Sequence, residues 1–137
     1  MSVLLLVFIF SESVLSTSRA TEQLSIQTVL GQAPSYELHT VTLRGVIREM
    51  TVLPPIPQFD PNMCSLLYGH ATFILEDDTG SLQVGVFGSC LPRAAASLPK
   101  EGDQVVLNAV IYISKGEGPV RVWAVANDIR LVQDATK

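Results

Sequence analysis

A tight turn flanked by two alternating stretches constrains this sequence more than any other feature. The turn, Asp77-Asp78-Thr79-Gly80, combines Asp and Gly, which favour the backbone of a β-hairpin. On both sides of it apolar residues recur at every second position, which is the period of a strand with one buried face. The residues expected to face inward are Ala71, Phe73, Leu75, Leu82, Val84 and Val86. The sequence therefore predicts an antiparallel hairpin that contributes one face to a hydrophobic core.

Three further stretches carry a strand pattern. They are residues 39–50, 104–114 and 120–132. In the first of them Val41, Leu43 and Ile47 are expected to face inward, and Gly45 falls on the same inward set in mid-strand. A glycine at such a place is typical of a sharp bend where a sheet curls into a barrel.

The segments between the strands predict two helices and one long loop. Residues 21–31 show mainly helical spacing of apolar residues, with Thr21 placed to cap the first turn. Residues 90–98 contain three successive alanines and are expected to form a short helix. Residues 51–67 contain four prolines, which cannot donate to a sheet, and are expected to form a long, partly stiff loop. Loops of this length are often functional.

Length and charge limit the classes of protein. A chain of 137 residues with 47% hydrophobic and 16% charged residues is large enough for one domain with a real core. Its net charge of −4, with nine Lys and Arg in total, opposes tight non-specific binding to polyanions. Any basic surface must therefore be local.

The amino-terminal residues resemble an export signal. Residues 3–10 are apolar but too few to cross a bilayer as a helix, and Ser18-Arg19-Ala20 places small residues where a signal peptidase acts. We therefore expect a signal peptide over residues 1–20, a mature domain over 21–132 with no membrane span, and a tail over 133–137. The expected location is periplasmic or secreted. No Lys or Arg precedes the apolar run, so an uncleaved segment or a wrongly assigned start, in a cytoplasmic protein, is the alternative.

The chain has two cysteines, Cys64 and Cys90. Extending the register of the central hairpin places Leu67 opposite Cys90, so the long loop can bring the two thiols into bonding range. Export would favour a disulfide between them. In a reducing compartment they would instead be small apolar residues.

Several of these stretches resemble bacterial OB-fold proteins related to nucleic-acid-binding modules. The similar motifs are residues 41–47, residues 73–84 with their Asp-x-Thr-Gly turn, and residues 101–107. The resemblance covers about residues 22–132. It implies an all-β fold: a five-stranded Greek-key barrel with an amino-terminal helix and a short helix between the third and fourth strands. It also implies a ligand lying across the second and third strands, between the first–second and fourth–fifth loops.

The residues predicted on that face are aromatic and basic. The hairpin register places His70 beside Phe87, and the last hairpin is expected to place Tyr112 opposite Arg121. Aromatic side chains there could stack on bases, and the basic ones could lie near phosphates. The candidate ligand-binding residues are Arg44, Arg48, Tyr68, His70, Phe87, Tyr112, Lys115, Arg121 and Trp123. The alternative for Phe87 and Trp123 is that the amino-terminal helix or the long loop covers them.

No motif of a catalytic site is visible in the sequence. It lacks a Gly-x-Ser-x-Gly elbow, a phosphate-cradling loop, a His-Glu-x-x-His pair and a Cys-x-x-Cys pair. The acidic residues Glu76, Asp77 and Asp78 are expected to form a solvated turn rather than a metal site. We therefore expect a non-catalytic binding module without cofactor or metal, whose ligand by resemblance is single-stranded nucleic acid. The alternative is an exported protein that engages a protein or envelope glycan through the proline-rich loop.

Overall fold

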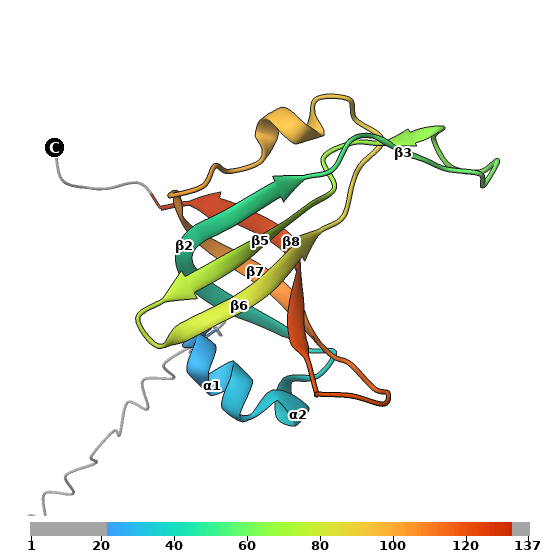
Figure 1. The fold of residues 1–137 in the computed structure, drawn as a ribbon. Coiled ribbons are helices and arrows are strands. Elements are labelled where there is room, and N and C mark those ends of the chain that lie inside the picture. The colour runs from blue at the N-terminus through green and yellow to red at the C-terminus, as the bar shows by residue number, and fades with distance from the viewer. Residues whose placement is uncertain (1–21, 133–137) are drawn as a thin grey trace, which may run out of the picture.

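The long strands of the protein close into a barrel. The computed structural model describes residues 22–132, and the expected signal peptide and tail lie outside them. The barrel strands are β2 (Thr40–Val52), β5 (Ala71–Asp77), β6 (Gly80–Val86), β7 (Gln104–Ile113) and β8 (Val122–Leu131). They follow the order β2-β5-β6-β8-β7, and β7 pairs back onto β2 (Figure 1). The predicted five-stranded OB-fold barrel is confirmed.

Strand β2 belongs to both sides of the barrel because it bends in its middle. Residues 40–46 pair with β7, and residues 46–52 pair with β5. At the bend, a Cβ on Gly45 would lie 2.6 Å from the carbonyl oxygen of Glu76. A side chain there would collide with backbone, so the close approach requires glycine. The predicted bend at Gly45 is confirmed.

The inward residues predicted from alternation form the core. The fully buried side chains include Leu43, Ile47, Ala71, Phe73, Leu75, Val84, Val105, Leu107 and Ile111. These come from β2, β5, β6 and β7, and β8 adds the buried Ala124. Because every wall of the barrel contributes, one continuous cluster fills the interior.

Two short helices close one end of this barrel. They are α1 (Ile26–Gly31) and α2 (Ala33–Tyr36), and both lie at the end of the barrel that the β5–β6 turn approaches (Figure 1). Ile26 and Val29 of α1 are fully buried in the core cluster. The expected helix therefore exists, but it begins later than predicted. Residues 23–24 instead form β1 (Gln23–Leu24), which pairs in parallel with β2, and Ser25 caps the helix.

The segment between β2 and β5 forms a projecting ribbon. Its strands, β3 (Ile56–Pro57) and β4 (Leu66–Leu67), pair in antiparallel fashion, and the ribbon extends away from the barrel (Figure 1). We call residues 53–67 the arm. A disulfide joins Cys64 of the arm to Cys90, with the two Cα atoms 5.7 Å apart, so the expected pairing is present. Beyond Cys90, the expected helix is a single 3₁₀ turn, η1 (Ala94–Ser97).

Side chains of the β5–β6 turn form hydrogen bonds both within the turn and to the first turn of α1. One carboxylate oxygen of Asp77 accepts hydrogen bonds from the backbone N–H groups of Thr79 and Gly80, at 2.7 and 3.0 Å. The other oxygen accepts from the backbone N–H of Ile26 at 2.9 Å, and Thr79 Oγ1 accepts from that of Gln27 at 3.0 Å. The Asp-x-Thr-Gly motif therefore fixes the hairpin and satisfies the first free N–H groups of the helix.

These bonds make a prediction about acid stability. Partial burial of Asp77 acts to raise its pKa, but the hydrogen bonds from Thr79, Ile26 and Gly80 outweigh it, so the pKa lies below its ordinary value. A lowered pKa stabilises the fold above the unfolded-state pKa of about 3.9, and this contribution is lost as the pH falls through the folded-state pKa. We expect Asp77→Asn to lower the free energy of unfolding by about 1 kcal/mol at pH 7, with the difference shrinking below about pH 4.

The check is urea unfolding of both proteins between neutral and acidic pH. Asp78→Asn is the matched control, because this neighbouring carboxylate is exposed. A difference between wild type and Asp77→Asn that stays constant down to the most acidic pH would contradict the assignment.

Candidate functional site

A groove of about 540 Å³ lies on the outer face of the barrel, where β5, β6 and β8 run side by side. The parallel pairing of β6 with β8 places Gln83 beside Trp123 and Gly85 beside Val125. Because Gly85 has no side chain, the part of the groove lined by the middle of β6 is open. We call this feature the β6–β8 groove. The side chains that give it its chemistry are His70, Thr72, Gln83, Phe87, Arg121 and Trp123.

Aromatic rings stand on opposite sides of the groove. On one side His70 and Phe87 meet edge to face, with ring centroids 6.1 Å apart, as their predicted pairing requires. Phe87 is 69% exposed, so neither the helices nor the arm covers it. On the other side Trp123 is half-buried and stacks on Tyr112, with centroids 5.8 Å apart and planes at 14°. A flat ligand therefore has aromatic surface available from two walls.

The register of the β7–β8 hairpin differs from the prediction by two residues. Tyr112 lies opposite Trp123, not opposite Arg121. The loop is longer than expected, because its closing pair is Ser114 and Arg121. The backbone N–H of Ser114 donates to the Arg121 carbonyl, and the Arg121 N–H donates to Ser114 Oγ, both at 2.9 Å. This register creates the Tyr112–Trp123 stack.

The groove differs in charge from the rest of the molecule. Although the chain carries a net charge of −4, no Asp or Glu lines the groove in the described part of the chain. Arg121 lies at its edge, and within residues 22–132 no carboxylate lies within 4.0 Å of its guanidinium. The local potential therefore suits an anionic or electron-rich ligand.

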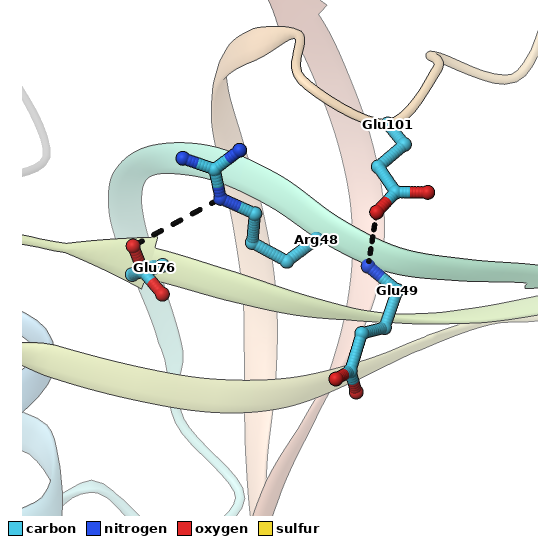
Figure 2. A network of polar contacts seen from close by, with 4 residues as sticks. All are labelled: Arg48, Glu49, Glu76 and Glu101. Carbon is cyan, nitrogen blue, oxygen red and sulfur yellow. Dashed lines mark hydrogen bonds and ion pairs between the residues drawn. The ribbon is translucent and has the colours of Figure 1, made fainter.

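Three of the predicted basic residues do not line the groove. Arg48 forms an ion pair with Glu76, with 3.9 Å between Nε and Oε1 (Figure 2). Lys115 forms one with Glu37, with 3.2 Å between Nζ and Oε1. Arg44 lines a separate hollow beside Gly45 and Asp77. Of the four predicted basic residues, Arg121 thus lines the groove, and Lys115 shares a smaller neighbouring hollow with it.

Figure 2 also shows a backbone contact next to the Arg48–Glu76 ion pair. The backbone N–H of Glu49 donates to Glu101 Oε1 at 3.3 Å, at a bulge where Glu49 adopts a φ of 50°. Glu76 is the carboxylate that approaches the Arg48 guanidinium, whereas the carboxylate of Glu49 points away from it (Figure 2). The Glu76 carboxylate thus offsets the positive charge of Arg48 that a phosphate would need.

Tyr68 is half-buried, and its backbone pairs with Ser89 at the base of the arm, outside the groove lining. Conversely, the prediction missed Thr72, Gln83 and Val125. The first two could have been found, because alternation already placed them on the outer face of the hairpin. Val125 could not, because nothing local in the sequence reveals the parallel pairing of β6 with β8.

Two further properties concern residues 22–132 as a whole. No three His, Cys, Asp or Glu side chains gather there in a way that could hold a metal ion. Among the same residues, no helix combines the length and the apolar character needed to cross a membrane.

Comparisons with known proteins support the fold alone. No protein-family model matches the chain, and no curated protein matches it. Similar structures include a Leishmania major Friedlin protein described as an aspartyl-tRNA synthetase, with a TM-score of 0.61 and 12% identity over 88% of this chain and 22% of that one. Replication protein A in a heterotrimer bound to ssDNA gives 0.55 and 12%, over 82% and 37%. The second OB-fold domain of replication protein A from Methanococcus maripaludis gives 0.51 and 15%, over 74% and 91%. This chain thus spans about a fifth of the synthetase and most of the isolated OB-fold domain.

Proposed function

We propose that this protein is a non-catalytic OB-fold module that binds single-stranded nucleic acid in the β6–β8 groove. The observation that carries the proposal is an aromatic groove of about 540 Å³ without acidic lining in an otherwise acidic protein. Its volume falls within the range of about 300–1,000 Å³ that is usual for ligand sites. It also lies across the strands where OB-folds bind their ligands.

Each wall of the groove would have its own role. One base would lie against Trp123, which Tyr112 supports from behind, and a neighbouring base against Phe87. Stacking of this kind tolerates any base and is worth about 1–3 kcal/mol per base. The open part of the groove at Gly85 would leave room for the strand between the two aromatic sides.

Polar groups would supply the remaining contacts. Gln83 and Thr72 offer an amide and a hydroxyl to the edge of a base, and the guanidinium of Arg121 would meet a phosphate. A comparison supports this choice of ligand: the replication protein A neighbour with a TM-score of 0.55 is bound to ssDNA.

The test is a fluorescence titration of a labelled single-stranded oligonucleotide with the protein at low salt, with a duplex of the same sequence as control. Because Arg121 is the cation that lines the groove in the described chain, we expect a shallow salt dependence. The slope of log K against log salt should be about −0.7 to −1.5, corresponding to one or two phosphates. Absence of binding at tens of micromolar protein, or equal binding to the duplex, would refute the proposal.

A second candidate function follows from the disulfide. We propose as the alternative that the chain is a bacterial exported protein that binds a protein or envelope glycan through the arm. The Cys64–Cys90 bond is typical of oxidising compartments, and Phe59 at the tip of the arm is 94% exposed. Mass spectrometry of the natively expressed protein tests it. A mature chain that starts at Thr21 with an oxidised cysteine pair would support export, and an intact Met1 with free thiols would oppose it.

A further inference from the structure

The tip of the arm exposes an aromatic residue that the rest of the fold does not use. Phe59 is 94% exposed, and Met63 across the tip is 49% exposed. Single exposed apolar residues are common on proteins, but Phe and Met are also enriched at protein interfaces. The tip therefore has the composition of an apolar anchor for an interface. We call Phe59 and Met63 the plug.

The backbone of the arm holds this plug in place. Beyond the β3–β4 pairing, the backbone N–H of Gln58 donates to the Ser65 carbonyl at 2.9 Å. At the tip, the backbone N–H of Met63 donates to the Asp60 carbonyl at 3.1 Å. The Cys64–Cys90 disulfide ties the ribbon to the barrel. A preorganised plug loses little conformational freedom when it docks.

The charge of the arm is opposite to that of the β6–β8 groove. Asp60, beside Phe59, is the one charged residue between positions 53 and 67, and no Lys or Arg occurs from residue 49 to residue 92. The groove offers aromatic walls, Arg121 and no acidic lining within the described residues. An aromatic residue followed by a carboxylate is thus complementary to an aromatic groove with an arginine at its edge.

We propose that the arm of one copy docks into the β6–β8 groove of a second copy, with Phe59 between the aromatic walls and Asp60 beside Arg121. A copy cannot fill its own groove in this way, because the ribbon pairing and the disulfide hold the arm pointing away from the barrel (Figure 1). Reciprocal docking would close a dimer, and one-way docking would build longer chains. In either case the plug and a nucleic-acid strand would compete for the same groove.

Self-association is measurable without nucleic acid, so its failure and the failure of the proposed function can be told apart. Sedimentation velocity of the oxidised protein up to about 1 mM should show a concentration-dependent increase in mass, because an interface built on one anchor is small and weak. Phe59→Ala should weaken association about tenfold or more. The matched control is Leu131→Ala, which removes an exposed apolar side chain at the far end of β8 and should have no effect.

A charge exchange tests the groove as the docking site. Asp60→Lys and Arg121→Glu should each weaken association several-fold, and the combined variant should recover most of the wild-type affinity. Circular dichroism verifies that each variant is folded. A wild-type protein that remains monomeric up to about 1 mM would overturn the inference. So would Phe59→Ala with unchanged association, or a combined charge variant no better than the single ones.

Discussion

Trp123→Ala is expected to weaken the binding of a single-stranded oligonucleotide by about tenfold to one hundredfold, which corresponds to the loss of one stacking platform. Trp123 should carry the largest share because Tyr112 supports its ring from behind at 5.8 Å, whereas Phe87 has only an edge contact with His70. The measurement is the fluorescence titration described above, at protein concentrations low enough to avoid self-association.

Conservative variants separate loss of stacking from loss of fold. Trp123→Phe keeps an aromatic face and should recover most of the affinity. Phe87→Ala removes a side chain that is 69% exposed, so it should weaken binding without lowering the free energy of unfolding. If Trp123→Ala binds as tightly as the wild type while remaining folded, the ligand does not use this groove.

Removal of the disulfide is expected to lower the free energy of unfolding by about 3 kcal/mol. Cys64 and Cys90 are 26 positions apart, and cross-linking them restricts the unfolded chain, whose entropy would otherwise favour unfolding. The measurement is urea unfolding of the Cys64→Ser, Cys90→Ser double variant beside the oxidised wild type. Wild type in the presence of a thiol reductant is the control, and it should behave like the double variant. A change well below 1 kcal/mol would contradict this stabilising role of the bond.

The sequence alone was sufficient to predict the β5–β6 hairpin and its register. The turn at Asp77–Gly80 fixed the pairs of Thr72 with Gly85 and Ile74 with Gln83 as expected, because its own hydrogen bonds leave no freedom of register. Gly45 was recognisable for a similar reason, since a glycine on the buried face of a strand usually marks a bend or a close approach of backbone.

The errors fall where tertiary structure decides. The glycine-rich loop between β7 and β8 has no preferred length, so the partner of Tyr112 could not be counted from the loop. The prediction of the basic ligand-binding residues failed in part for a similar reason. Arg48 and Lys115 look like free cations in the sequence, but folding brings each beside a glutamate from another segment.

Because β8 lies between β6 and β7, truncation of the chain before this strand would disrupt the barrel. A polypeptide that stopped before Val122 would keep two long strands, each with an open row of backbone donors and acceptors. Such open edges pair with strands of neighbouring molecules. A shortened chain is therefore expected to aggregate rather than to fold as a smaller domain. The last ten-residue strand, β8, is thus required for the barrel to close.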